Sequence, residues 1–344
     1  MEYINKVNSL DNILRPKLDS HDDFVIENNK LYAEYEQFDR LNLMYPIIIE
    51  ERQWQWEFYS GNVIKSKQHI YLQGILYDKS AHIQVSSPNN GLIWNTSADL
   101  RAGPDSNLLA ILLADDRNLL NRFINWPYDP IDRDNSNRLV IGPVLVIKAL
   151  IGGNLVRAQE ELDKYQADLG NKKNDKYFIV DIPILESMME GDIVMFKESI
   201  QPLLDVKFLK RRRSFGHKIM ELLAVEAAYF IKAMWILGHE VVIDHPLIPM
   251  DLMPIEPLAE YPVPYFFLDG YKGELPENYV KWLAITPEER EAQAQESTAE
   301  HKHPAFDPDI YSTPVEQRMI EACISKGLIV KGDKDDGWKI YKDT

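Results

Sequence analysis

Apolar positions recur at helical spacing over the central part of the chain, and three short segments interrupt that pattern in the same way. LLADDRNLL, LIGGNLVRA and MMEGDIVMF each place two apolar residues before a short polar or Gly turn, which ends in an Asp or Asn. That residue is Asp116, Asn154 or Asp192, so both intervals are 38 residues long. Its side chain can accept from the free N–H groups that begin a helix. Glycines that tolerate the left-handed backbone at a helix end precede two of the three, at Gly152, Gly153 and Gly191. The pattern predicts three consecutive helix–turn–helix units.

The same periodicity predicts where the helices lie. We expect them over residues 107–114, 116–125, 138–151, 154–166, 178–190, 192–205 and 214–237. The last is apolar almost all round, which is typical of a helix buried on several sides. Hairpins that repeat about every 34 to 45 residues are typical of α-solenoids of the tetratricopeptide or HEAT kind. The predicted fold class is therefore mainly α, with stacked helical hairpins arranged as a tetratricopeptide-like α-solenoid or a helical bundle.

The segment before the repeats is also expected to be mostly helical. The pattern favours helices near residues 31–39 and 66–82. Between them, ERQWQWEFYS places aromatic residues at alternate positions from Trp54 to Phe58, which would suit a strand, but a helix is equally open and is the one we favour. Residues 86–106 are rich in Ser, Asn, Gly and Pro and separate this cap from the repeats.

The composition of the chain changes after the long apolar helix. Residues 245–267 contain six prolines, which exclude a continuous helix, interleaved with large apolar residues that do not suit a solvated linker. We expect this Pro-rich segment to be extended and packed over the helices. Residues 313–328 predict a short helix, and GLIVKGDKDDGWKIYK predicts a β-hairpin that turns at Asp335, Asp336 and Gly337. The expected domains are an N-terminal cap (1–100), a hairpin-repeat domain with the Pro-rich segment (101–285), a charged tether (286–304) and a C-terminal helix with β-hairpin (305–344).

Charge narrows the class of partner. Acidic residues outnumber basic ones 54 to 38, which gives a net charge of −16 and a pI near 5.0. Such a charge repels nucleic acid at long range and favours a basic protein partner. We therefore expect no nucleic-acid binding, while the oligomeric state cannot be inferred from the sequence.

Cysteine usage and hydropathy predict a location. Cys323 is the single cysteine and cannot form an intramolecular disulfide, which suits a reducing compartment. The longest apolar window, residues 219–238, contains Glu221, Glu226 and Lys232, whose insertion into a bilayer is unfavourable. The first residues lack the apolar core of a secretory signal. We expect a cytoplasmic protein with no membrane span.

One segment gathers potential metal ligands. HEVVIDHP contains His239, Glu240, Asp244 and His245. A zinc protease needs two histidines four residues apart on one helical face, whereas these are six apart and follow Gly238, where the helix is expected to end. We favour turn and capping roles. A metal-dependent hydrolase that uses His239, Asp244 and His245 is kept as an alternative.

Other candidate motifs give weaker signals. DKDDG lacks the spacing of a calcium loop, and the chain contains no phosphate-binding glycine motif or nucleophile elbow. The basic run KFLKRRRSFGHK, residues 207–218, could bind an anion, but cations at a helix end also complement its dipole. HKH at residues 301–303 is too short to indicate a metal site. We expect no catalytic residue, no cofactor and no metal.

A helical array without catalytic motifs and with strong negative charge suits a protein-binding role. Solenoids expose long concave surfaces that bind proteins, and an acidic field accelerates the capture of a basic partner. The densest acidic loops are candidates for that contact, namely Asp129, Asp132 and Asp134 in DPIDRDN, and Asp333, Asp335 and Asp336 in the predicted hairpin turn.

The block GHKIMELLAVEAAYFIKAMWILGHEVVIDHPLIPMDLMP resembles the bacterial immunity protein 49 family, found beside polymorphic toxins. The shared features are a long helix rich in Ala, Leu and aromatic residues, then Leu237-Gly238-His239, an extended run, an acidic residue, and Leu247-Ile248-Pro249. Turns such as Gly191-Asp192 also fit the helical layout of that family. The resemblance covers about residues 105–268 and leaves the C-terminal hairpin unmatched.

The resemblance implies a function by binding. It implies a mostly helical protein that binds a cognate toxin delivered by a neighbouring cell and neutralises it by occlusion, which carries over no catalytic residues. We therefore expect an immunity protein with a basic toxin as partner. Besides the metal-dependent hydrolase, a tetratricopeptide-like scaffold of a secretion apparatus is a second alternative.

Overall fold

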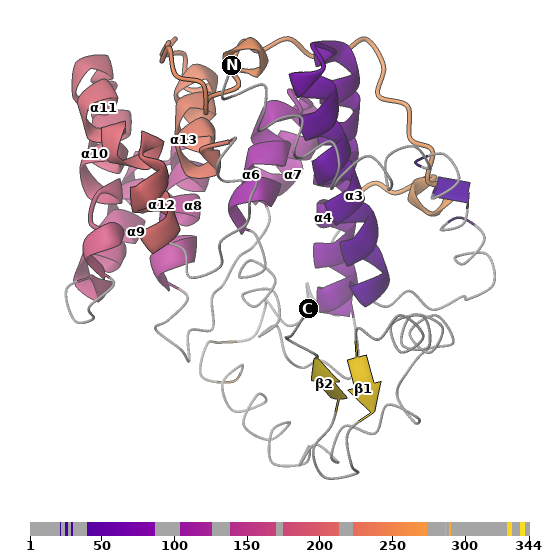
Figure 1. The fold of residues 1–344 in the computed structure, drawn as a ribbon. Coiled ribbons are helices and arrows are strands. Elements are labelled where there is room, and N and C mark those ends of the chain that lie inside the picture. The colour runs from indigo at the N-terminus through magenta and orange to yellow at the C-terminus, as the bar shows by residue number, and fades with distance from the viewer. Residues whose placement is uncertain are drawn as a thin grey trace.

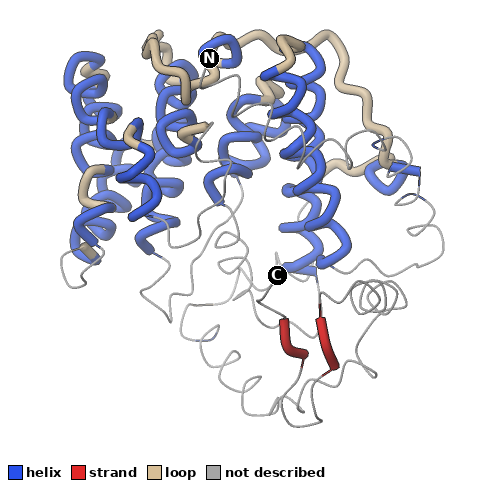
Figure 2. Tube along the Cα trace, in the orientation of Figure 1, coloured by secondary structure: helices blue, strands red, loops and turns tan. Residues whose placement is uncertain are grey.

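Helices joined in pairs by tight turns make up most of the chain that the computed structural model describes (Figures 1 and 2). The described residues are 21, 25–26, 29, 40–86, 104–125, 138–169, 175–212, 223–273, 286, 289, 329–331 and 338–340. The α-helices are α3 (Arg40–Tyr59), α4 (Val63–Ser86), α6 (Pro104–Leu113), α7 (Arg117–Asn125), α8 (Arg138–Ile151), α9 (Leu155–Asp168), α10 (Asp181–Glu190), α11 (Ile193–Ser199), α12 (Val206–Arg212) and α13 (Val225–Ile236). Short 3₁₀ helices are η1 (Asp175–Tyr177), η2 (Gln201–Leu204), η4 (Met250–Leu252) and η5 (Phe266–Leu268). The fold of the described part is mainly helical, as predicted.

The three predicted turns share one backbone conformation. The residue before each capping position has a left-handed backbone, with φ of 55° at Asp115, 73° at Gly153 and 70° at Gly191. These three residues are again 38 positions apart, so the repeat seen in the sequence is also a repeat of conformation. Glycine adopts positive φ without strain, while Asp is one of the few other residues that tolerate it.

The predicted capping bonds are confirmed. Asp116 accepts from the backbone N–H of Leu119 at 2.7 Å, and Asn154 accepts from that of Arg157 at 3.0 Å. Asp192 accepts from two N–H groups, those of Val194 and Met195, both at 2.9 Å. Each cap satisfies N–H groups that the first helical turn leaves without a partner, so these residues fix where α7, α9 and α11 begin.

A fourth turn of the same kind joins α3 to α4, and the sequence pattern missed it. Gly61 has φ of 82°, and Asn62 accepts from the N–H of Lys65 at 3.4 Å. The aromatic run lies within α3, which confirms the helical interpretation. Trp54 is buried there and donates to Gln73 of α4 at 2.8 Å. A fourth antiparallel pair therefore precedes the three predicted ones.

Two of the predicted helices differ from the structure by more than about one turn. The helix expected over 192–205 ends as α11 at Ser199, and η2 follows with Pro202 in its first turn. Proline lacks an N–H and its ring clashes with the preceding turn, which interrupts an α-helix. Of the helix expected over 214–237, the described part contains α13 (Val225–Ile236), preceded by non-helical Leu223 and Ala224, while residues 213–222 lie outside the described part.

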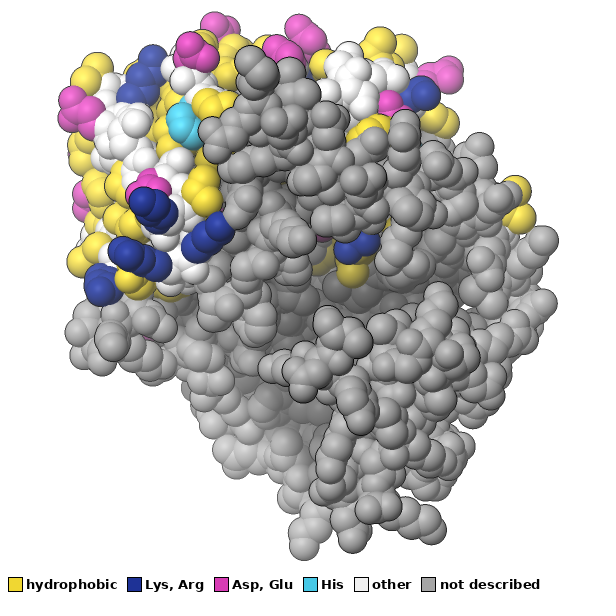
Figure 3. Space-filling model, in the orientation of Figure 1, with side chains coloured by type: hydrophobic (Ala, Val, Ile, Leu, Met, Phe, Trp, Pro, Cys, Tyr) yellow, Lys and Arg dark blue, Asp and Glu magenta, His cyan; other side chains and the backbone are white. Residues whose placement is uncertain are grey.

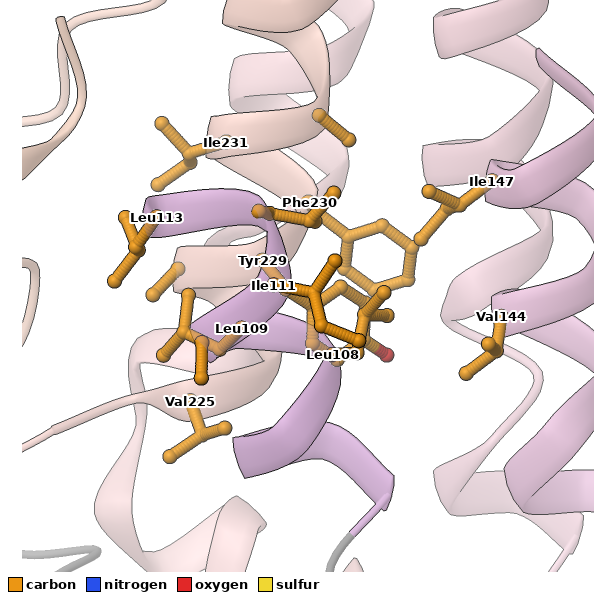
Figure 4. Packing of buried hydrophobic residues seen from close by; sticks show 14 of the residues in the cluster. Leu108, Leu109, Ile111, Leu113, Val144, Ile147, Val225, Tyr229, Phe230 and Ile231 are labelled. Carbon is orange, nitrogen blue, oxygen red and sulfur yellow. The ribbon is translucent and has the colours of Figure 1, made fainter. Parts of the chain in front are cut away.

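Helix α13 is buried along its length and packs against α6 and α8. Tyr229 and Phe230 lie between the apolar side chains of α6, such as Ile111, and those of α8, such as Ile147 (Figure 4). These residues belong to one hydrophobic cluster that runs from α3 and α4 through α6, α8 and α10 to the segment after α13. The apolar character of α13 on all sides therefore reflects its position in the core.

An irregular segment follows α13, and we call residues 239–271 the strap. It crosses the ends of the helices and descends along one side (orange in Figure 1). Leu247, Leu252 and Tyr265 are buried, which confirms that the predicted Pro-rich segment packs on the helices, although Phe266 is exposed. The helices in the described part include none that is long and apolar enough to cross a membrane.

Two short strands lie near the end of the chain. Strand β1 (Ile329–Lys331) pairs antiparallel with β2 (Trp338–Ile340), with Val330 opposite Lys339. The six residues between them, and the helix predicted over 313–328, lie outside the described residues.

Candidate functional site

The histidines predicted as a possible metal site do not come together with the nearby acids. The His239 ring lies against Gly191 at the α10–α11 turn, where a Cβ on that glycine would be 2.8 Å from the ring. His245 accepts from the backbone N–H of Leu247 at 3.3 Å. Asp244 is exposed. Of the described residues, none in this segment belongs to a group of three potential ligands. The contacts of His239 and His245 are therefore packing and hydrogen bonding at turns, not metal binding.

The basic run divides into buried and exposed residues. Arg212 is buried at the end of α12 and donates to Asp181 at 2.8 Å and to Glu226 at 2.9 Å. Lys207 and Lys210 are exposed, and residues 213–218 lie outside the described part. Arg212 therefore links α12 to α10 and α13 and is a structural residue, not part of an anion site.

The acidic residues predicted to contact a partner lie outside the described residues, namely Asp129, Asp132, Asp134, Asp333, Asp335 and Asp336. Their role stays a prediction. A different group of acidic residues is exposed on the strap.

The strap carries acidic charge alone. The chain has no Lys or Arg between Lys232 and Lys272. Six acidic residues lie in that interval and all are exposed: Glu240, Asp244, Asp251, Glu256, Glu260 and Asp269. Apolar side chains are exposed beside them at Val242 and Ile255. Hydrophobic and acidic side chains, together with Lys or Arg side chains of other elements, are visible along the upper edge of the molecule in Figure 3, where the strap crosses the helices in Figure 1. This combination of charge and apolar contact suits a protein-binding surface.

A buried ionic group fixes the middle of the strap. Asp115, in the α6–α7 turn, forms ion pairs with Lys67 of α4 at 2.9 Å and with Lys232 of α13 at 2.6 Å. Lys232 also donates to the backbone oxygens of three strap residues, Leu252, Met253 and Pro254. Burial lowers the pKa of Lys232, while Asp115 opposes that change. All three charged side chains are almost completely buried, so the strap closes over them.

Further hydrogen bonds hold the strap along its length. Trp235 donates to the carbonyl of Val241 at 2.9 Å near its start, and the N–H of Ala224 donates to Leu247 at 2.9 Å. Lys67 donates to the carbonyl of Glu256 at 2.6 Å. Near its end, the hydroxyl of Tyr271 donates to Asp78 of α4 at 3.0 Å. The acidic side chains therefore project from a backbone that is anchored at both ends and in the middle.

Exposed apolar residues also recur at the helix turns. The second residue of α4, α9 and α11 is Ile64, Val156 or Val194, with exposed fractions of 63%, 73% and 69%. Each follows a capping residue by two positions, so the three share one place in the repeat. Single exposed apolar residues are common in proteins, and the equivalent position after Asp116 is the polar Asn118, so three of the four turns expose an apolar residue here.

A separate polar cluster lies between α3, α4 and the end of the strap. Glu50 of α3 is completely buried; its two carboxylate oxygens lie 3.0 Å from Nε2 of His21 and 2.6 Å from Nδ1 of His69 on α4. The hydroxyl of Tyr265 donates to Glu50 at 2.5 Å. Burial raises the pKa of Glu50, but the hydrogen bonds to both histidines outweigh it and hold the pKa at about 2. The carboxylate is therefore ionised at neutral pH.

Sequence reasoning missed this cluster. His21 has no local signal that connects it with the other residues. Glu50 and His69, however, lie about equally far from the turn at Ser60 and Gly61, and residues so placed in an antiparallel helical pair face each other. Recognition of the α3–α4 turn would have suggested that pair. The acidic strap could also have been found, because the absence of Lys and Arg over almost 40 residues is visible in the sequence.

Comparison of the chain with protein families, with curated proteins and with solved structures finds no match in any of the three.

Proposed function

We propose that this protein is an immunity protein that neutralises a cognate toxin by stoichiometric binding. The observation that carries the proposal is the anchored strap, which presents six exposed acidic residues and contains no Lys or Arg. The resemblance to the immunity protein 49 family supports the same role. The partner would be a basic toxin, and the protein would act in the cytoplasm of the producing cell.

Charge and order act on different steps of such binding. A surface of one sign accelerates encounter with a partner of the opposite sign, most strongly at low salt. Tight protection also needs a slow dissociation, with a Kd of about 1 nM or below. A surface that is already ordered loses little conformational entropy on binding. The strap is ordered in this way by the hydrogen bonds that Lys67 and Lys232 donate to its carbonyls and by the one that Tyr271 donates to Asp78.

The way in which the helical pairs stack is also part of this proposal. The consecutive helical pairs would stack as a tetratricopeptide-like α-solenoid, with α13 and the strap closing one side. A scaffold that binds peptides in a groove along α6 and α8 has less support, because α13 already packs against both helices. In this proposal the binding face lies on the strap.

The direct test uses the product of the adjacent gene. That product is expressed in cells with and without the full-length protein, and growth, co-purification and affinity are measured. Rescue of growth together with a 1:1 complex of nanomolar affinity supports the proposal. The proposal is wrong if the two proteins neither co-purify nor show rescue.

A matched pair of charge variants tests the strap. Asp244→Lys with Glu260→Lys reverses two strap charges, and Glu160→Lys with Glu198→Lys reverses two exposed charges on α9 and α11. Both double variants change the net charge equally. We expect the strap variant to slow association by about tenfold or more at low salt, and the control to change it little. Equal effects in the two variants would refute a specific role of the strap.

A further inference from the structure

The polar cluster of His21, Glu50 and His69 has the composition of a metal site. One potential ligand atom from each residue lies within 4.8 Å of the other two, and the described part of the chain contains no other such group of three. We propose that His21, Glu50 and His69 together bind one Zn²⁺ ion. This inference does not depend on the proposed toxin-binding function.

The donor set selects the class of metal. Two imidazole nitrogens and one carboxylate oxygen form a ligand set that binds Zn²⁺, with a fourth position left for water. The same set can bind other first-row transition metals. Mg²⁺ and Ca²⁺ prefer oxygen ligands throughout, so two histidines disfavour them.

The distances require only a small adjustment. Zinc ligands at about 2.0–2.2 Å in tetrahedral arrangement lie roughly 3.3 Å from one another. Nε2 of His21 and Nδ1 of His69 lie 3.0 Å and 2.6 Å from the oxygens of Glu50. The two rings meet edge to face, with centroids 5.0 Å apart. A rotation of the rings that separates the donor atoms by less than about 1 Å would admit the ion.

Exposure and charge both favour binding. The side chains of His21 and His69 are 14% and 13% exposed, so an ion can reach them from solvent, while Glu50 is sealed below. A buried carboxylate needs a compensating charge. In the described part of the chain Glu50 forms ion pairs with His21 and His69 alone, and a cation bound between them would supply that charge. Tyr265 donates to the same carboxylate and would orient it toward the ion.

The ion would join three parts of the chain. His21 is a helical residue before α3, Glu50 and His69 belong to the α3–α4 pair, and Tyr265 belongs to the strap. Because these segments come together only in the folded protein, bound metal would stabilise the fold by mass action. The site would therefore fasten the end of the strap.

The test uses tag-free, full-length protein stripped with a chelator. Zn²⁺ is titrated by calorimetry, bound zinc is counted by elemental analysis, and the melting temperature is measured with and without zinc. We expect one Zn²⁺ per chain and a higher melting temperature. His21→Ala and His69→Ala should each weaken zinc binding by at least about tenfold. Double variants at His239 and His245, and at His301 and His303, should bind as wild type does.

Chemical modification gives a readout that needs no variant. Bound zinc should protect His21 and His69 from diethylpyrocarbonate, as mapped by mass spectrometry, and should leave His239 and His245 unprotected. This measurement decides the question if a variant fails to fold. The proposal is overturned if the wild type binds no zinc, if the zinc is lost only in the control variants, or if neither His21 nor His69 is protected.

Discussion

Replacement of Asp115 by Asn tests the buried ionic group that holds the strap. The substitution removes one charge and almost no volume. Asn also tolerates the left-handed backbone at this position, where φ is 55°. The change therefore isolates the electrostatic contribution from the conformational one.

The expected loss follows from the burial of the partners. The side chains of Lys67 and Lys232 are 3% and 0% exposed, and both face Asp115. Without it, two ammonium groups stay buried without a counter-charge, and removal of one partner from a buried pair costs about 3–5 kcal/mol. Backbone carbonyls of the strap still accept from both lysines. We expect a loss of about 3–4 kcal/mol in unfolding free energy.

The assay is urea unfolding, followed by circular dichroism and by tryptophan fluorescence, with coincident transitions required before a free energy is derived. Lys232→Met should lower the unfolding free energy by less, about 1–3 kcal/mol, because Asp115 still forms its ion pair with Lys67 and the main loss is the hydrogen bonds from Lys232 to the strap carbonyls. In the double variant the two effects should not add, with a coupling energy of about 1–3 kcal/mol. Glu160→Gln on the exposed face of α9 is the control and should change stability by less than about 0.5 kcal/mol.

The pH dependence separates charge from packing. Asp115 opposes the lowering of the Lys232 pKa by burial, so its removal should lower that pKa further. At a pH between the lowered pKa of Lys232 and the ordinary lysine pKa, this lysine is protonated in the unfolded chain but largely neutral in the folded one. The free energy of unfolding therefore rises with pH in this range. The difference in unfolding free energy between the wild type and Asp115→Asn should therefore decrease between pH 7 and pH 9.5. A loss below about 1 kcal/mol, strict additivity with Lys232→Met, or a deficit independent of pH would refute this reasoning.

Three further predictions concern a buried lysine and the repeated turns. Burial lowers the pKa of Lys148 to about 7. At a pH between this value and the ordinary lysine pKa, Lys148 is therefore protonated in the unfolded chain and largely neutral in the folded one. Between pH 7.5 and 9.5 the wild type should therefore gain stability relative to Lys148→Met, by up to about 1.4 kcal/mol per pH unit in urea unfolding. Gly153→Ala should cost about 1–2 kcal/mol through positive φ alone, whereas Gly191→Ala should cost about 1 kcal/mol more in thermal melts because its Cβ would meet the His239 ring. Asn154→Ala should lose about 1 kcal/mol with its cap, and an unchanged melting temperature would contradict the capping role.

The turns illustrate what local sequence can predict. Gly191 followed by Asp192 satisfies both the end of α10 and the start of α11 with groups that lie within a few residues. The same holds for Gly153 and Asn154. Because these bonds are local, their residue types recur at a fixed spacing and can be found without a structure. The α3–α4 turn escaped notice because its helices are longer and its spacing differs from 38.

The burial of charges illustrates what could not be predicted. From the sequence alone, Lys232 served only as evidence against a membrane span, and Arg212 was one of several cations in a basic run. Their partners, Asp115 and Asp181, lie far away along the chain. No local pattern distinguishes a lysine that ends in a buried ion pair from one that faces solvent.

The sequence by itself determined the helical character of the chain, the positions of the repeated turns, the packing of the Pro-rich segment and the acidic charge of the strap, since all of these depend on neighbouring residues or on composition. The tertiary structure decided which charges are buried, that α13 lies against α6 and α8, and that His21, Glu50 and His69 meet. The physical reason is that these contacts join segments separated by many residues, and their geometry exists only after the helices have packed.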